Sequence, residues 1–401
     1  MGSKLNLLWD HFRFYVLDAV GMLFCRYAIG KGKLLLVRLD AIGDFVVFLD
    51  SAKEYRRLYP EQKIILCANS TWVEIARAVP YWDEVWAVDV KRLTSELSYR
   101  FETVRKIRRA GFEIAIQPTF SRVFLHGDSV IRVSGAMQRI GSVGDPVSGN
   151  SKLKLISDRW YTALIPAAQS ILAELERNAE FIRNLSGQDF EAKLPVLETR
   201  SSLPDRLKIS ADYFIVFPGA SWKGRQWPRS NFVEVIRQLH QNYGWLAVVC
   251  GGPSEKRLCQ SIVDQCPSIA KNFGGATSLP ELLELLRGAR LLISNETSAV
   301  HLATAVSTPV VCILGGGHFG RFLPYPGFAS DAQPLVAMHK MDCYNCNWIC
   351  RQKHDPAGAF PCVSGVAIED VTVLVGRNFL KTSKLGVDGV AVMRYSRRLV
   401  D

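Results

Sequence analysis

Short apolar runs alternate with amphipathic stretches along most of the chain. In the first half the apolar runs predict strands at residues 34–37, 63–68, 84–88, 113–117 and 138–141. Helices with one apolar face are predicted after residue 44 and at residues 71–79, 95–110, 122–134 and 167–185. Strands that alternate with helices in this way are typical of a parallel sheet covered by helices on both faces.

A second alternating unit follows a stretch rich in Gly and Pro. We predict its strands at residues 213–217, 245–250, 291–294 and 309–314, and its helices at residues 230–241, 255–265, 279–288 and 297–306. Residues 142–160 contain clusters of Gly, Ser, Asn and Asp and are predicted to be a loop. The pattern therefore indicates two doubly wound α/β domains that face a central cleft. Their expected boundaries are 1–30 (a helix), 31–185 (first domain), 186–210 (linker), 211–381 (second domain) and 382–401 (tail).

Length and charge agree with this organisation. A chain of 401 residues with 48% hydrophobic residues is too long for one core and has little room for disorder. The 49 Lys and Arg exceed the 38 Asp and Glu, which gives a net charge of +11 and favours polyanionic partners. The basic residues are dispersed rather than gathered with aromatic residues on one strip, so we predict no nucleic acid partner.

The N-terminal stretch 5–29 is rich in apolar and aromatic side chains but is interrupted by charges. It lacks a secretory cleavage site, and the ten cysteines of the chain then indicate a reducing, cytoplasmic compartment. The charges argue against a helix that spans a membrane. Two interpretations remain: a helix packed on the first domain, or an amphipathic helix at an anionic membrane surface, for which Lys31 and Lys33 provide flanking charge.

Residues 33–60 combine a strand, a tight turn and a helix. The apolar run 34–37 stops at the turn DAIGD, and an amphipathic helix follows. Gly43 stands where a side chain would obstruct a ligand, and Asp44 places a carboxylate at the helix N-terminus. That edge of a parallel sheet is where such folds bind ligands. Capping of the helix by Asp44 is the alternative interpretation.

A loop that opens the second domain has the composition of a phosphate-binding site. PGASWKGRQWP, residues 218–228, follows a strand and carries Lys223 and Arg225 among small residues. Small residues let backbone N–H groups approach a phosphate, and a guanidinium can bind two of its oxygens. A solvated basic loop is the structural alternative.

A second such site is predicted at residues 293–303, ISNETSAVHLA. Small polar residues end a strand and cap a helix, whose N-terminus attracts anions. His301 lies one turn after Thr297 on the same face, and a packed histidine is the structural alternative. Glu255, in a loop that also follows a strand, is a candidate for a nucleoside contact, with capping by Ser254 as an equally good account. No Walker loop or dinucleotide fingerprint is present.

Four cysteines, Cys343, Cys346, Cys350 and Cys362, form a C-x2-C-x3-C-x11-C cluster. A structural zinc site, reduced core thiols, and disulfide or redox chemistry are all compatible with this spacing. The metal status of the cluster is therefore left open.

Taken together, these segments resemble the family 9 glycosyltransferases, the bacterial lipopolysaccharide heptosyltransferases. The resemblance rests on VRLDAIGDFVV, PGASWKGRQWP, the stretch FGGATSLPELLELLRGARLLISNETSAVHLATAVSTPVV and the GGGHFGR loop. It covers residues 33–380 approximately and keeps its order along the chain. It implies a GT-B fold, in which two Rossmann-like domains bind the acceptor on the N-terminal side and the nucleotide-sugar donor on the C-terminal side.

The resemblance also implies a reaction. A heptose, or a related sugar, would pass with inversion and without a metal from ADP-heptose to a sugar hydroxyl of a lipid-linked core saccharide. Asp44 corresponds to the proposed general base of the family. The donor-site positions of the family correspond to Ser221, Arg225, Glu255, Glu296, Thr297, Ser298 and His301. The expected location is the cytoplasm, peripherally on the inner face of the inner membrane.

Two departures from the family pattern put the donor sugar in doubt. The segment Glu296–Ser298 (ETS) stands where the family has Asp-Ser/Thr-Gly, and Arg225 stands where it usually has Lys. Alternatives are a hexose or modified sugar, a GT-B transferase that uses a UDP- or GDP-sugar, and a sugar-nucleotide-binding protein without catalysis.

Overall fold

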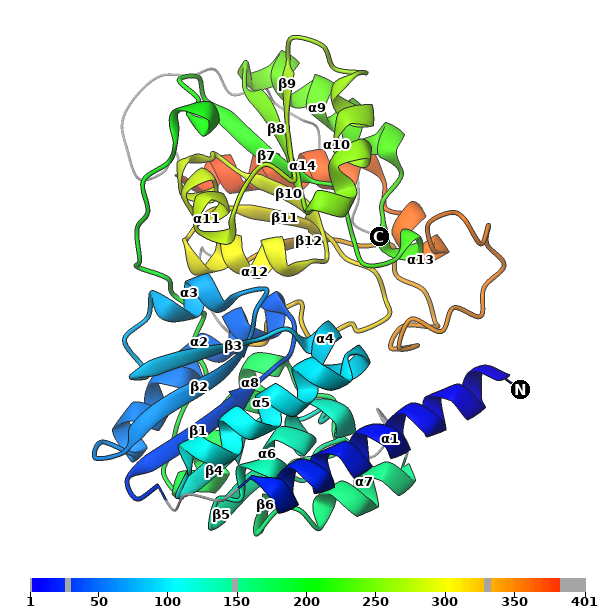
Figure 1. The fold of residues 1–401 in the computed structure, drawn as a ribbon. Coiled ribbons are helices and arrows are strands. Elements are labelled where there is room, and N and C mark those ends of the chain that lie inside the picture. The colour runs from blue at the N-terminus through cyan, green and yellow to red at the C-terminus, as the bar shows by residue number, and fades with distance from the viewer. Residues whose placement is uncertain (1, 26–29, 146–150, 328–332, 383–401) are drawn as a thin grey trace.

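The computed structural model describes residues 2–25, 30–145, 151–327 and 333–382. Within them the chain forms two halves, each built on one six-stranded sheet in which all strand pairs are parallel (Figure 1). The predicted α/β fold class is confirmed. The domain boundaries remain a prediction.

The first sheet has the strand order β3-β2-β1-β4-β5-β6. In its central strand the apolar residues 34–37 are all buried, as expected for a parallel sheet covered by helices. The strands are β1 (Lys33–Arg38), β2 (Lys63–Asn69), β3 (Glu84–Val88), β4 (Ile114–Gln117), β5 (Gln138–Ser142) and β6 (Ala163–Ile165).

The second sheet, in the order β9-β8-β7-β10-β11-β12, repeats the topology of the first. Both correspond to the doubly wound order in which the chain reverses direction beside the first strand, and the loops at the carboxyl ends next to that point bind ligands. The strands are β7 (Tyr213–Phe217), β8 (Leu246–Gly251), β9 (Ala270–Gly274), β10 (Leu292–Asn295), β11 (Val310–Ile313) and β12 (Leu335–Ala337).

Helices cover both sheets (Figure 1). In the first half they are α1 (Gly2–Phe24), α2 (Ile42–Leu58), α3 (Val73–Arg77), α4 (Val90–Ser95), α5 (Leu97–Ala110), α6 (Ser129–Ser134), α7 (Ser151–Asp158) and α8 (Glu174–Ser186). In the second half they are α9 (Arg229–Tyr243), α10 (Lys256–Val263), α11 (Leu279–Gly288), α12 (Ser298–Ala305), α13 (Pro361–Ser364) and α14 (Ile368–Thr382).

Several sequence predictions need correction. The stretch 142–160, predicted to be a loop, contains α7, and the helix predicted from residue 167 begins only at Glu174. The helix predicted at residues 122–134 is interrupted by a π-helical turn before α6, because His126 has a non-helical backbone. The short strands β6, β9 and β12 were not predicted.

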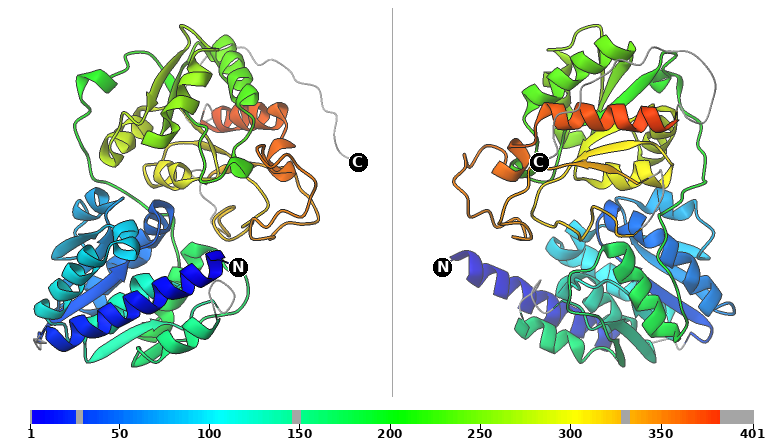
Figure 2. Two further views of the ribbon diagram at one scale, coloured as in Figure 1. Left: turned by 45° about the vertical axis from the view of Figure 1, so that its right-hand side comes forward. Right: turned by 180° about the vertical axis from the view of Figure 1, so that it is seen from behind.

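Helix α1 packs along α5 and is fixed by a buried ion pair (Figure 2). Arg100 donates to both carboxylate oxygens of Asp18, at 2.7 and 2.6 Å, and Ser129 completes the cluster with a third hydrogen bond. The interpretation of α1 as a helix packed on the first half is therefore confirmed. Its outer face exposes Phe12, Val16, Val20, Leu23 and Phe24.

In the described parts of the chain, no helix combines the length and the apolar character needed to cross a membrane.

The two halves contact each other through helices that begin at the carboxyl ends of the sheets. Helix α2 of the first half packs on α12 of the second, and α3 packs on α11. The candidate site residues of both halves are brought together at this boundary.

Candidate active site

Asp44 lies in the first turn of α2, directly after β1 and its turn. The N-cap residue of α2 is Ala41, so no side chain caps the helix, and the capping interpretation of Asp44 is not supported. Burial, together with the nearby carboxylates of Asp40 and Glu174, raises the pKa of Asp44 to about 7, although Arg38 and Arg321 oppose the shift. A carboxyl group with a pKa near neutral pH is suited to accept a proton during catalysis.

Arg38 connects Asp40 to the backbone of Asp44. It is the last residue of β1 and is almost fully buried, with Nε 2.9 Å from Asp40 Oδ2. Its other nitrogens donate to Asn178 Oδ1 at 3.2 Å and to the backbone oxygen of Asp44 at 3.3 Å. The guanidinium thus connects β1, the turn and α2, and balances part of the negative charge beside Asp44.

A second arginine reaches the same group from the other half of the molecule. Arg321, in the loop after β11, lies 2.8 Å from Glu174 Oε1, and its Nη2 donates to Ser121 Oγ at 3.1 Å. The backbone N–H of Glu174 in turn donates to the oxygen of Arg321 at 2.7 Å. This bridge joins the first turn of α8 to the glycine-rich loop 315–321 and crosses the boundary between the halves.

In the second half, Asn295 at the end of β10 organises the loop after β7. Its Nδ2 donates to the oxygen of Pro218 at 2.7 Å, and its Oδ1 accepts from the N–H of Trp227 at 3.0 Å. The loop carries Arg225, whose Nη2 donates to the backbone oxygen of Glu296 at 2.8 Å. The two loops predicted to bind phosphate therefore lie side by side.

Glu296 and Arg225 keep unused hydrogen-bonding atoms. Both carboxylate oxygens of Glu296 and Nε of Arg225 are buried and have no hydrogen-bond partner among the described residues. The nearest approach of the two side chains is 3.5 Å, between Arg225 Nη2 and Glu296 Oε2. Burial raises the pKa of Glu296 to about 7, against the attraction of Arg225. Buried polar atoms without partners are costly, and here a ligand with hydroxyl and anionic groups would satisfy them.

Helix α12 begins at the boundary, where Thr297 is its N-cap and Ser298 its first residue. His301, one turn later, is buried and forms a hydrogen bond of 2.5 Å between Nδ1 and the hydroxyl of Tyr325. Burial lowers the pKa of His301 to about 4, so the imidazole is neutral at pH 7. A Cβ atom on Gly43 would lie only 3.1 Å from Cδ2 of His301. The space that Gly43 leaves open is thus occupied by a side chain of the other half.

Two other predicted donor-site residues, Ser221 and Glu255, lie in the loops after β7 and β8. Ser221 is exposed in the loop after β7. Glu255 lies against Gly219 of that loop and accepts from the N–H of Gly252 at 2.7 Å. Glu255 itself caps the turn after β8, so the alternative that assigned the cap to Ser254 is wrong.

The cysteine cluster lies in the segment 341–362, which packs on the glycine-rich loop. Cys362 is buried and its Sγ accepts from the N–H of Gly316 at 3.5 Å, whereas Cys343, Cys346 and Cys350 are partly exposed. Within the described residues, no three His, Cys, Asp or Glu side chains are arranged to hold a metal ion. We derive no catalytic step from a metal at these thiols.

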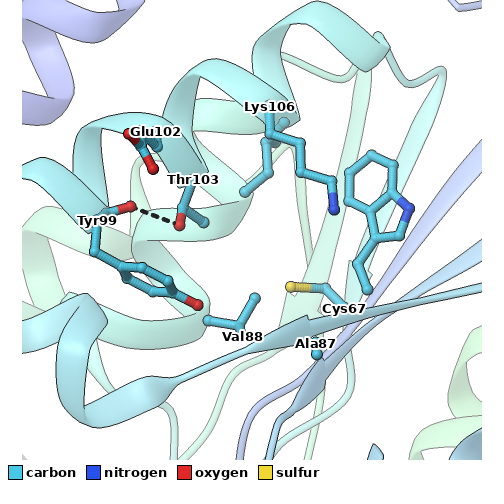
Figure 3. Close-up of a pocket in the computed structure, with 9 residues that line it drawn as sticks. Cys67, Ala87, Val88, Tyr99, Glu102, Thr103 and Lys106 are labelled. Carbon is cyan, nitrogen blue, oxygen red and sulfur yellow. Dashed lines mark hydrogen bonds between the residues drawn. The ribbon is translucent and has the colours of Figure 1, made fainter.

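A cavity of about 220 Å³ lies elsewhere in the first half, between β2, β3 and α5 (Figure 3). Lys106 points toward Trp86 there, with Nζ 4.3 Å from the centre of the ring. None of its lining residues is a predicted site residue.

Comparison with known proteins agrees with this arrangement. The sequence model of glycosyltransferase family 9 (heptosyltransferase) matches residues 164–340. Lipopolysaccharide heptosyltransferase 1 of Pseudomonas aeruginosa is 21% identical over 322 residues, which are 76% of this chain and 86% of that protein. The predicted resemblance to glycosyltransferase family 9 is confirmed, and the chain is a glycosyltransferase.

Solved structures share the fold of this glycosyltransferase. A family 9 glycosyltransferase from Veillonella parvula superposes with a TM-score of 0.66 at 16% identity and covers 88% of this chain and 98% of its own. An E. coli heptosyltransferase with ADP superposes with a TM-score of 0.62 at 15% identity, over 86% of this chain and 99% of its own. The predicted GT-B architecture is thus confirmed.

Three charged residues near Asp44 were not singled out from the sequence. Arg38 had a local signal, since an arginine at the end of a fully apolar strand is unusual. Arg321 ends the GGGHFGR loop but was not singled out, and Glu174 had no local signal; the two residues are 147 positions apart and meet only in the folded chain.

Proposed function

We propose that this enzyme transfers a heptosyl group, with inversion, from ADP-heptose to a sugar hydroxyl of lipopolysaccharide core or a related surface glycan. The observation that carries the proposal is the contact of Gly43 with His301, which sets the first turn of α2, with Asp44, against the helix that follows the donor loops. Similarity to heptosyltransferases, one of them solved with ADP, supports the choice of donor.

In the proposed mechanism Asp44 is the general base. It accepts the proton of the acceptor hydroxyl while that oxygen attacks the anomeric carbon on the face opposite the leaving nucleotide. The new bond forms as the bond to the diphosphate breaks, so inversion follows. A pKa near 7 gives Asp44 both a substantial ionised fraction and adequate basicity at neutral pH.

The departing diphosphate is stabilised by groups of the second half. Arg225 supplies a fixed positive charge and an unused Nε–H, and the N-terminus of α12 adds its backbone dipole. The carboxylate of Glu296 is suited to accept hydrogen bonds from sugar hydroxyls. We propose that this charge stabilisation makes a metal unnecessary. Undiminished activity after EDTA treatment would support that step, and restoration by Mg²⁺ or Mn²⁺ alone would contradict it.

A calorimetric titration tests the donor. We expect ADP-heptose and ADP to bind, and UDP-glucose and GDP-mannose to bind much more weakly. Preference for UDP or GDP would keep the reaction class and move the enzyme to another donor. Glu296 and Ser298 are larger than the Asp and Gly of the family, which favours a modified sugar as the second candidate. ADP-heptose and ADP-linked modified sugars should therefore be compared as donors. Donor binding without turnover on any acceptor would indicate a non-catalytic protein.

We also propose that the acceptor is reached at an anionic membrane surface, on the inner face of the inner membrane. The outer face of α1 supports this, because its apolar side chains lie at intervals of three and four residues and remain exposed while the ion pair Asp18–Arg100 holds the inner face. Helix α7 runs beside α1 and exposes Leu155 and Ile156 with Lys152 (Figures 1 and 2). Anionic lipid would match this charge.

Vesicle sedimentation tests this placement. The double substitution L23S/F24S should release the enzyme from phosphatidylglycerol vesicles while activity on a water-soluble acceptor is kept. V373S removes an exposed apolar side chain from α14 in the other half and is the control. Equal vesicle binding by L23S/F24S and wild type would refute the role of α1.

A further inference from the structure

The cysteine-containing segment 341–362 is part of the donor side of the molecule. The N–H groups of Asn345 and Asn347 donate to the backbone oxygens of Gly316 and Gly317, at 2.7 and 3.0 Å. Figure 2 shows this orange segment projecting from the second half beside α13. The segment is therefore fastened to the glycine-rich loop rather than hanging free in solvent.

Trp348 is the side chain that this segment inserts between the donor loops. Its ring lies so close to the glycine-rich loop that a Cβ on Gly315 or Gly317 would fall 2.6 or 2.2 Å from it. The guanidinium of Arg225 lies over the same ring, 4.6 Å from its centre. The glycines are thus required for close approach, and the tryptophan forms a wall beside the phosphate-binding arginine.

A second aromatic residue secures the other donor loop. The N–H of Phe360 donates to the oxygen of Gly224 at 2.7 Å, and its ring occupies the space where a side chain on Gly224 would lie. The rings of Phe360 and Trp348 stack with an interplanar angle of 23°. One segment therefore contacts both loops that flank the diphosphate in the proposed function.

The indole N–H of Trp348 lacks a partner. Trp348 is only 7% exposed, and its Nε1 is buried without a hydrogen bond to any described residue. Nε of Arg225, whose guanidinium stacks on this ring, is also buried without a hydrogen bond to any described residue. Two buried N–H donors beside each other fit a ligand that offers acceptor oxygens and negative charge, which describes a diphosphate.

We infer that Trp348 is a donor-binding residue, and that its indole N–H hydrogen-bonds an oxygen of the donor diphosphate. The inference rests on the proposed function and extends it: the cysteine-containing segment, to which no role was assigned from the sequence, supplies a wall of the donor site. The rest of the indole positions Arg225 by stacking.

The test is the binding of ADP and of adenosine to W348F, measured by calorimetry. Phe keeps a ring that can stack on Arg225 and removes the N–H, so ADP should bind about ten-fold more weakly while adenosine binding stays unchanged. W245F is the matched control, because Trp245 is in the same half and is also 7% exposed but lies directly before β8. The melting temperature of each variant, compared with wild type, identifies any loss through unfolding.

Equal affinity of W348F and wild type for ADP would overturn the hydrogen bond while leaving the donor site itself intact. An equal loss for adenosine and ADP would also overturn it, since the contact would then not involve the diphosphate. Failure of the wild-type enzyme to bind ADP, UDP or GDP would refute the donor site, and with it this role of Trp348.

Discussion

The two halves of the molecule share one strand order and differ in the chemistry at the carboxyl ends of their strands. Next to β1 the first half gathers carboxylates, namely Asp40, Asp44 and Glu174, and burial raises the pKa of Asp40 and of Asp44. Next to β7 and β10 the second half presents Arg225, unpaired donors and a helix N-terminus. The same backbone scaffold therefore serves proton transfer on one side and anion binding on the other, and the loop sequences alone make the difference.

The largest effect should come from removing the proton acceptor. We expect D44N to lower kcat by about 10² to 10⁴, as is usual for a general base, with donor affinity close to wild type. Steady-state kinetics and calorimetry together test this division. D189N, an exposed carboxylate after α8, is the control. Substantial turnover by D44N would show that the first half does not carry the base.

Removing Arg225 from the second half should lower donor affinity, which D44N is expected to leave close to wild type. R225A loses a charged hydrogen-bond donor at the diphosphate, so we expect donor affinity to fall about 10- to 100-fold. R229A removes an exposed arginine four residues later and controls for net charge. If R225A kept its donor affinity, the anion-binding assignment of this side would fail.

The buried charge of Glu296 should lower the stability of the folded protein at high pH. Because burial raises the pKa of Glu296 from 4.5 to about 7, the folded protein binds this proton more tightly than the unfolded chain does. Its stability contribution is complete below about pH 4.5 and is lost as the pH rises through 7. E296Q should therefore raise the free energy of unfolding at pH 8, on the order of 2 kcal/mol, and change little at pH 5.

Urea unfolding at the two pH values measures this difference, with E234Q at a partly exposed glutamate of α9 as control. A stabilisation of equal size at both pH values would mean that the charge of Glu296 is not its cause.

The smallest expected effect is a shift in the pH dependence of kcat/KM, and its direction shows how the neighbouring charges act on Asp44. Asp44 must be ionised to act, so kcat/KM should fall below about pH 7. E174Q removes a negative neighbour and should move this limb to lower pH by up to about one unit, whereas R321Q removes a positive neighbour and should move it to higher pH. Both variants break the same bridge. Shifts in the same direction would therefore show that loss of the bridge, not charge, controls Asp44.

The sequence predicts a strand well where a short apolar run is bounded by turns. Strands β3 and β7 were predicted to the residue, because each is a short apolar run bounded by turns. The edge strand β9, AKNFG, has no such pattern and forms because β8 pairs with it. Helix α7 was missed because Gly, Ser and Asn surround it.

The site divides in the same way. Asp44 and Arg225 could be found because each lies in a local strand–loop–helix pattern. The groups that adjust them could not: Glu174 acts on Asp44 through space, and Trp348 reaches Arg225 from a segment more than a hundred residues later in the chain. Local patterns identify the reacting groups, whereas their pKa values and partners depend on tertiary contacts.

Gly43 has a consequence for the size of the working site. With a glycine on one side and the imidazole of His301 on the other, α2 and α12 leave no room for a larger side chain at position 43 unless His301 shifts. Larger side chains at position 43 would act as graded spacers, each adding a fixed increment of separation between the base and the donor loops. The side chain at position 43 thus controls the separation between Asp44 and the donor loops, and glycine gives the smallest separation.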